Sequence, residues 1–428
     1  MLDFFQNKRM SNETARIGKN FFFLTLLQAA NFLLPLLTLP YLVRVLGTDL
    51  FGLVMFAQTF ALFFNVLVDF GFNLSATREV SIHRNDKKKI SQLFSSVMAI
   101  KFFLILLSLF LITILLFIVP RFQMDWKIYY LSFGMVIGQA LFPVWYFQGI
   151  ERMKIISYIN IFTKIIFTVL IFIVIKDASD YLLVPIINAI GFIIAGFIGL
   201  FLALKNIIIL KPKKIETIKL FRESSQLFIS NLSVTLYTIT NTLILGLFTN
   251  NTMVGIYASM EKLVLAIKNL YTPFFQAIFP WVASKNKTEL IKIIKKLILP
   301  LFTIGFIAFI TILVGAKTIL NLIYNNELIS EYSAIFKILG SIAVFSALNM
   351  LLNTVFLTAL KMYRERMKIM LITGITNVIL AIILVYYYGI YGIAISVAFS
   401  EFLLLIFGFL YFKVSKNEDL NHLTNSNT

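Results

Sequence analysis

Cysteine is absent from this 428-residue chain, and charged residues are scarce. Without cysteine there is no disulfide bond, no thiol nucleophile and no cysteine-based metal site. Asp, Glu, Lys and Arg make up 14% of the residues, whereas soluble domains contain about a quarter. The two histidines, His83 and His422, lie in polar segments, so no imidazole proton relay is expected within the apolar part of the chain.

Motifs for nucleotide or metal chemistry are also missing. The sequence contains no Walker motif, no Gly-rich nucleotide loop, no HExxH and no spaced set of metal ligands. We therefore expect no ATP hydrolysis, no cofactor and no metal. A membrane polymerase or glycosyltransferase would need a sizeable aqueous loop or domain, and the loops are too short for one. The sequence indicates a protein that is not an enzyme.

Apolar residues dominate what is present, at 59% of the chain with a mean hydropathy of +0.90. Many separate apolar runs exceed about 18 residues, which is typical of transmembrane helices. The pattern predicts an all-α polytopic membrane protein with about twelve spans. The predicted helices cover residues 20–43, 51–72, 93–119, 127–148, 155–176, 181–204, 224–248, 253–280, 297–316, 334–359, 368–387 and 391–412.

The net charge of +18 is explained by its distribution. If the N-terminus is cytoplasmic, 28 Lys and Arg fall in the inner segments, 5 in the outer loops and 5 within helices. This asymmetry follows the positive-inside rule, so both termini are predicted to be cytoplasmic. No cleavable signal sequence is expected, because the N-terminal segment lacks an apolar core. We expect no nucleic-acid partner.

A short internal repeat predicts two halves. The pentapeptide ERMKI occurs at 151–155 and 365–369, each time before an apolar helix at an equivalent place in a six-helix half. Six helices restore the orientation, so the two lobes would be parallel repeats. The expected organisation is an N-terminal lobe (1–204), a basic cytoplasmic linker (205–223), a C-terminal lobe (224–412) and a cytoplasmic polar tail (413–428).

Residues 31–84 form the most informative stretch, two apolar segments that meet at a short polar break at Thr48 and Asp49. The segments read LPLLTLPYLVRVLG and FGLVMFAQ…VDFGFNLSATREVS. This block resembles the Wzx-type flippases for O-antigen and related polysaccharide repeat units. These flippases belong to the multidrug/oligosaccharidyl-lipid/polysaccharide exporter superfamily, so the resemblance implies a MATE-like, twelve-helix architecture.

The resemblance also implies a function. It implies a protein that flips polyprenyl-diphosphate-linked oligosaccharide across the bacterial cytoplasmic (inner) membrane through a cation-lined lumen, for O-antigen or another surface polysaccharide. A polysaccharide polymerase and a chain-length regulator are further candidate partners. The alternative on the same scaffold is an ion-coupled multidrug exporter. An exporter of cationic drugs would favour an acidic lining, whereas this chain has more lysines than carboxylates within its apolar helices.

Charges within apolar helices need a reason, because each costs roughly 2.5–3.5 kcal/mol at mid-bilayer. The densest set lies in the predicted helix 253–280, where Glu261 and Lys268 are seven residues apart and share one stripe, with Lys262 rotated away. One interpretation is a structural ion pair with a carboxylate of another helix. The other is a cationic lumen that meets an anionic substrate.

Other candidates are more dispersed. Lys101 and Lys164 are further candidate lumen residues, and snorkelling to the interface is the alternative for Lys101. Glu401 could couple transport to protons or neutralise a lysine. Arg44 could be an outer-interface anchor or a gate, and Arg44 and Lys262 are also candidate lumen residues. Glu261 is a candidate for gating and coupling.

The hairpin supplies the remaining gating candidates. Pro35 and Pro40 remove backbone donors inside the first segment and predict a bend there. Asp69 and Arg78 flank the exit of the second segment and could pair only if Gly71 breaks the helix.

Overall fold

The chain is helical throughout the part that this computed structural model describes. That part comprises the backbone of residues 2–425 and the side chains of 26, 28, 30 and 33–415 apart from 230, 277 and 280. Within these residues no strand occurs, which confirms the predicted all-α class. The chain divides into two compact units. Unit 1 contains the chain up to residue 38 and residues 57–231, and unit 2 contains residues 39–56 and the chain from 232.

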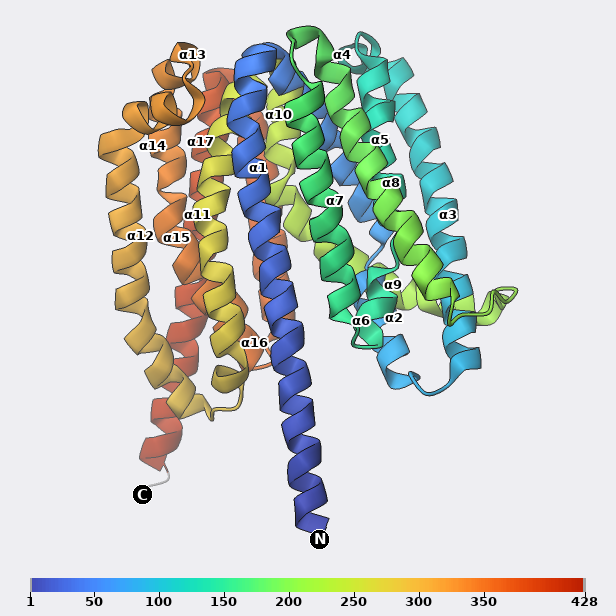
Figure 1. Ribbon diagram of the computed structural model, residues 1–428. Coiled ribbons are helices and arrows are strands. Elements are labelled where there is room, and N and C mark those ends of the chain that lie inside the picture. Colours follow the sequence, from blue (N-terminus) through green and yellow to red (C-terminus); the bar gives the residue numbers. More distant parts are fainter. Residues whose placement is uncertain (1, 426–428) are drawn as a thin grey trace. The chain divides into compact units, whose positions relative to one another are not determined.

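Figure 1 labels the helices in chain order. The first are α1 (Leu2–Asp69), α2 (Phe72–Ile82), α3 (Lys87–Ile118), α4 (Pro120–Gln123), α5 (Trp126–Leu141), α6 (Val144–Gly149), α7 (Met153–Val174), a 3₁₀ turn (Ala178–Leu182) and α8 (Leu183–Leu204). The chain continues with α9 (Lys214–Thr238), α10 (Thr240–Phe248), α11 (Asn251–Ala283), α12 (Lys287–Tyr324), α13 (Glu327–Glu331), α14 (Ser333–Gly340), α15 (Ile342–Asn349), a π-helical segment (Met350–Phe356), α16 (Leu357–Ala359) and α17 (Tyr363–Asn425).

Eight helical stretches among the described residues are long and apolar enough to cross a membrane. Two of them, residues 33–82 and 363–415, are 50 and 53 residues long, whereas about 20 residues suffice for one crossing. Each contains a glycine with non-helical backbone angles, Gly47 or Gly389, and so divides into two crossings. The bent pair α9–α10 passes the same test when its two helices are taken together. Helix α11 is 33 residues long. These helices agree with the predicted count of about twelve.

The first hairpin breaks at a glycine and not at its prolines. Backbone angles within α1 are non-helical only at Gly47, where φ is 72°. Pro35 and Pro40 therefore sit in a continuous helix, and the Thr38 hydroxyl donates to the Pro35 carbonyl at 3.1 Å. The bend at Pro35 and Pro40 stays a prediction, and the break between the two predicted segments lies at Gly47.

The two ERMKI pentapeptides lie at or just after turns of the same backbone geometry, but they are out of register. In unit 1, Glu151 adopts a left-handed conformation (φ 59°), and the Arg152 amide donates to the Phe147 carbonyl at 2.8 Å. In unit 2 the same turn centres on Lys361 (φ 60°), with the Met362 amide on the Leu357 carbonyl at 2.8 Å. Glu151 thus corresponds to Lys361. The second ERMKI lies four residues, about one helical turn, further along, inside α17.

Unit 2 contains a very close approach of two helices. The part of α1 after Gly47 crosses α11 at Gly52 and Gly255. A Cβ atom on Gly52 would lie 1.8 Å from the Asn251 carbonyl oxygen, and one on Gly255 would lie 2.1 Å from that of Thr48. Small residues permit such contacts between membrane helices. Glycine is therefore required at both positions by space.

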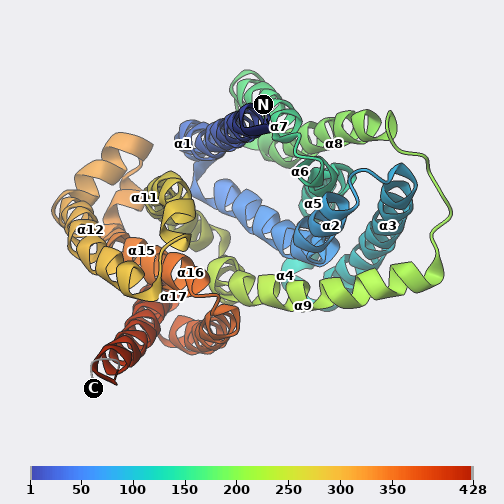
Figure 2. The same ribbon diagram turned by 90° about the horizontal axis from the view of Figure 1, so that it is seen from below.

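The predicted basic linker leads into α9, which lies lengthwise in the view of Figure 2. One face of the part of α9 that belongs to unit 1 packs against α2, α3 and the end of α1. The Phe221 and Phe228 rings stack on Phe70 at 4.4 and 4.9 Å, and the Ser224 and Ser75 hydroxyls lie 2.7 Å apart. The opposite face exposes Ile215, Ile218 and Arg222. This periodicity makes the start of α9 amphipathic.

Candidate functional site

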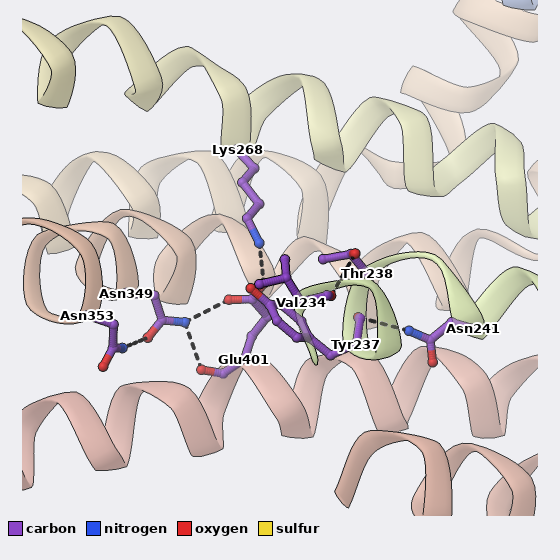
Figure 3. Close-up of polar contacts among 8 residues, drawn as sticks. All are labelled: Val234, Tyr237, Thr238, Asn241, Lys268, Asn349, Asn353 and Glu401. Atoms are coloured by element: carbon purple, nitrogen blue, oxygen red, sulfur yellow. Dashed lines mark hydrogen bonds and ion pairs between the residues drawn. The ribbon is translucent and has the colours of Figure 1, made fainter. Parts of the chain in front are cut away.

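The charged residues predicted from the sequence gather in two buried clusters, one in each unit. In unit 2, Lys268 of α11 forms an ion pair with Glu401 of α17 (Figure 3). In unit 1, Lys101 of α3 lies 3.8 Å from Asp69 of α1. The sequence left two interpretations of Lys268 open, a structural ion pair and a lumen cation. The ion pair with Glu401 agrees with the first of them. Whether these side chains also meet a substrate remains a proposal.

Glu401 is held on several sides in the unit 2 cluster. The Asn349 side-chain amide donates to the Glu401 carboxylate at 2.7 Å and to its backbone carbonyl at 2.9 Å (Figure 3). The Asn353 side-chain amide donates to the Leu404 carbonyl at 3.0 Å. The Glu401 side chain is 6% exposed, whereas that of Lys268 is 24% exposed. Lys268 is therefore the member of the pair that another molecule can reach.

A π-helical segment shapes this cluster. Residues 350–356 lie between α15 and α16, and Asn349 and Asn353 sit at its start and within it. Such segments often occur at functional sites. Tyr237 lies beside Glu401 in Figure 3, and the Asn241 side chain donates to the Tyr237 carbonyl at 3.1 Å across the α9–α10 break. The sequence analysis missed these asparagines, although polar amides four residues apart in an apolar run were a usable signal.

The unit 1 cluster opens into a cavity of about 130 Å³. Asp69 and Lys101 lie in its wall, and their side chains are 17% and 4% exposed. Uncharged polar side chains complete the polar part of the wall, namely Asn65, Asn73, Gln139 and Asn160. A pair of opposite charges surrounded by amides suits a small polar or charged group inside otherwise apolar helices.

Gly71 does break the helix, but Asp69 and Arg78 do not pair. Phe70 and Gly71 both have positive φ, 47° and 80°, so α1 ends at Asp69 and α2 begins at Phe72. The Arg78 guanidinium donates instead to Glu79 at 2.8 Å and is exposed. The hypothesis of an Asp69–Arg78 contact was wrong, because Asp69 is directed to Lys101 of α3.

Arg44 connects two helices of unit 2. Its guanidinium donates to the carbonyls of Ile323 and Tyr324 at 2.7 and 3.1 Å. These are the last carbonyls of α12, where a cation is favoured by unsatisfied acceptors and by the helix dipole. Arg44 thus caps the end of α12, and its roles as a membrane-interface anchor, a gate or a lumen residue stay predictions.

The other predicted residues lie outside the two clusters. Glu261 accepts a hydrogen bond from the Thr242 hydroxyl at 3.5 Å and does not form an ion pair with Lys268. Lys262 of α11 and Lys164 of α7 are partly exposed. No group of three or more His, Cys, Asp or Glu among the described residues is placed to hold a metal ion.

A family profile described as "Polysaccharide biosynthesis protein" matches residues 17–285, more than half of the chain. The chain belongs to the polysaccharide biosynthesis protein family. Membership agrees with the resemblance seen in residues 31–84 and confirms the family predicted from them.

Two relatives named "Putative O-antigen transporter" extend this family assignment. That of Escherichia coli (strain K12) is 29% identical over 73% of this chain and 77% of its own length. That of Shigella dysenteriae is 28% identical over 91% of this chain and 98% of its own length.

Solved structures share the fold. An inward-facing multidrug resistance MATE family transporter of the MOP superfamily aligns with a TM-score of 0.64 at 16% identity, over 89% of this chain and 94% of its own. The lipid II flippase MurJ in an inward closed conformation aligns with a TM-score of 0.62 at 18% identity, over 91% of this chain and 87% of its own. The predicted MATE-like architecture is therefore confirmed.

The unit 1 pair yields a first testable expectation. Replacing Asp69 by Asn leaves the Lys101 ammonium buried without a counterion, which typically costs about 3–5 kcal/mol. We expect the Asp69→Asn protein to unfold at a temperature several degrees lower in detergent, and Asp69→Asn/Lys101→Met to recover most of the loss. Asp49→Asn is the matched control, because Asp49 is an exposed carboxylate of α1 that accepts a hydrogen bond from the Thr252 hydroxyl at 3.0 Å. Equal melting temperatures for Asp69→Asn and Asp49→Asn would contradict this expectation.

Proposed function

We propose that this chain is a flippase that moves polyprenyl-diphosphate-linked oligosaccharide repeat units from the inner to the outer leaflet of the bacterial cytoplasmic membrane. The observation that carries the proposal is the similarity to the O-antigen transporter of Shigella dysenteriae over 98% of that protein's length. The product would be the O-antigen or another surface polysaccharide.

The two buried clusters support this function physically. A diphosphate bearing sugars cannot cross about 30 Å of hydrocarbon alone, because its charges and hydroxyls would lose their water. Transport needs polar and cationic groups within apolar helices. The Lys268–Glu401 and Asp69–Lys101 clusters supply such groups, and both lysines lie in long apolar helices.

Charge exchange at Lys268 is the role that we propose for the unit 2 cluster. Lys268 is four times as exposed as Glu401, so an anionic phosphate can approach the ammonium while Asn349 continues to hold the carboxylate. A phosphate oxygen and a carboxylate oxygen are equivalent acceptors for an ammonium donor. Glu401 thus keeps Lys268 charged and oriented when no substrate is bound.

The topology is part of the same proposal. The excess of Lys and Arg in alternate loops supports cytoplasmic termini. The lobes predicted from the repeat, residues 1–204 and 224–412, would provide alternating access. A polysaccharide polymerase and a chain-length regulator are the protein partners that we propose downstream of the flippase.

Reconstituted vesicles test the activity directly. Purified protein is incorporated into vesicles with a fluorescent polyprenyl diphosphate oligosaccharide, and a membrane-impermeant periodate reagent reports how much of it reaches the outer leaflet. We expect the inner pool to become accessible with the protein and to stay protected without it. Ethidium efflux under an imposed proton or sodium gradient, measured in parallel, tests the multidrug exporter alternative. Efflux without oligosaccharide flipping would reverse the assignment.

A further inference from the structure

Unit 1 contains a second cavity that neither the clusters nor the family explains. Its volume is about 370 Å³, and it lies where the α2–α3 turn, α6 and the segment after α8 meet. Three cationic side chains line it, Arg84 of the turn, Lys87 at the start of α3 and Arg152 directly before α7. Elements distant in sequence thus bring basic groups to one hollow.

The charge of this cavity is only partly neutralised. Arg84 donates to Glu151 at 3.1 Å, with side chains that are 47% and 33% exposed. The left-handed conformation of Glu151 turns the chain between α6 and α7. This turn places Arg152 next to the cavity. Within the described residues, neither Lys87 nor Arg152 forms an ion pair or a side-chain hydrogen bond. The lining of the cavity among the described residues therefore carries a net positive charge.

Helix geometry adds to the same field. Lys87 is the first residue of α3, which has 32 residues, and Arg152 is the cap residue of α7, which has 22. The N-terminus of α7 favours an anion in this region, whereas that of α3 is already capped by the Asp86 carboxylate, which accepts from the Lys89 amide at 2.9 Å. Arg152, the N-cap residue of α7, provides no side-chain acceptor for the first backbone amides of that helix.

The rest of the lining is half polar and half apolar. Asn85, Asn206 and Tyr146 bring polar groups, while Ile90, Ile150 and Ile207 are apolar. The next two residues along the chain, Ile208 and Ile209, are 60% and 73% exposed. A soluble anion would not gain from the exposed isoleucines beside the cavity, whereas a lipid carries a phosphate next to hydrocarbon.

We propose that this cavity binds the phosphate group of a lipid headgroup in the inner leaflet. The placement at the inner leaflet rests on the proposed function and topology. Arg152 and Lys87 hold the phosphate oxygens, Asn85 and Asn206 can donate to them, and the exposed isoleucines contact the acyl or prenyl chain. The lipid is either the polyprenyl diphosphate of the substrate or an anionic phospholipid of the same leaflet.

Binding measured by native mass spectrometry of the purified full-length protein tests the proposal. The probes are polyprenyl diphosphate, phosphatidylglycerol and inorganic phosphate. We expect Lys87→Gln/Arg152→Gln to weaken binding of at least one of the two lipids about tenfold, because two charge-assisted hydrogen bonds are lost. The control Lys295→Gln/Lys296→Gln removes two exposed lysines of α12 and should change binding less than about twofold.

The arms of the experiment separate the possible outcomes. A selective loss of polyprenyl diphosphate binding identifies a substrate-docking site, and a selective loss of phosphatidylglycerol binding identifies a phospholipid site. Lys87→Arg/Arg152→Lys keeps both charges and should retain binding, which distinguishes lost contacts from misfolding. Equal lipid affinities for the glutamine variant and the α12 control would overturn the proposal, as would binding of inorganic phosphate as tight as that of the lipids. This binding experiment does not measure flipping, so its outcome does not depend on the result of the transport assay.

Discussion

Replacing either Lys268 or Glu401 alone is expected to lower the amount of folded protein in the membrane several-fold and to abolish display of the surface polysaccharide. Lys268→Met leaves the Glu401 carboxylate, 6% exposed, with amide partners but no cation. Glu401→Gln leaves the Lys268 ammonium without an anion. Breaking a buried ion pair from one side costs about 3–5 kcal/mol, a large share of the stability of most folded domains.

The double variant Lys268→Met/Glu401→Gln separates structure from transport. It contains no unpaired charge, and Gln can still accept the hydrogen bond from Asn349. We therefore expect membrane levels and thermal stability close to those of the unchanged protein. Transport should not recover, because the cation that meets the diphosphate is gone. Quantitative blotting of membranes, melting in detergent and staining of the polysaccharide measure the three quantities.

Recovery of all three quantities in the double variant would assign the pair a purely structural role. The proposal of charge exchange at Lys268 would then be wrong. Recovery of protein level without polysaccharide would support it. As a control, Asn353→Ala removes an amide that bonds the Leu404 carbonyl at 3.0 Å and the Asn349 side-chain oxygen at 3.5 Å but contacts neither charge directly, so it should lower stability without a selective effect on transport.

Helices and their breaks were predictable from the sequence because they depend on local patterns. Runs of apolar residues indicated the spans, and the polar break predicted at Thr48 and Asp49 lies directly after the kink at Gly47. Pro35 and Pro40 lie in the regular helix that precedes this kink, and the positive φ at Gly47 ends that helix.

Partners between helices could not be derived in the same way. The helical period relates Lys268 to Glu261 on the same stripe, but the partner of Lys268 is Glu401, 133 residues away on α17. A period of 3.6 residues specifies which side chains share a face and says nothing about which helix that face meets. The same limit hid the Lys101 contact of Asp69. Depth and charge identified the residues, and tertiary packing selected their partners.

The ERMKI repeat shows a related limit of prediction from the sequence. Two copies of ERMKI lie near two turns of the same geometry, yet the residues at the same place in those turns are Glu151 and Lys361, which differ in type. The common element is a left-handed residue that lets the following amide bond back to the preceding helix. Backbone geometry is shared between the two turns, while the charge at the central position is opposite.

Gly52→Ala is expected to be among the most damaging small substitutions in the chain. The added methyl group would lie 1.8 Å from the Asn251 carbonyl oxygen, so α1 and α11 would have to separate by about 1 Å or more. Asn251 begins α11, and the obstacle is backbone that cannot rotate away as a side chain can. We expect a lower melting temperature in detergent and the loss of oligosaccharide flipping in vesicles. Gly255→Ala should behave alike, since its Cβ meets the Thr48 carbonyl oxygen at 2.1 Å.

Gly315→Ala is the matched control for this close approach. Gly315 also lies in a long apolar helix, α12, but a Cβ there meets only the end of the flexible Ile319 side chain at 3.3 Å. Alanine favours a helix over glycine by about 1 kcal/mol, so this variant should be neutral or slightly more stable. The sign of the effect therefore differs between the two glycine-to-alanine changes. A Gly52→Ala protein that melts and flips like Gly315→Ala would show that the segment 39–56 is not fastened to α11 at the Gly52–Gly255 crossing.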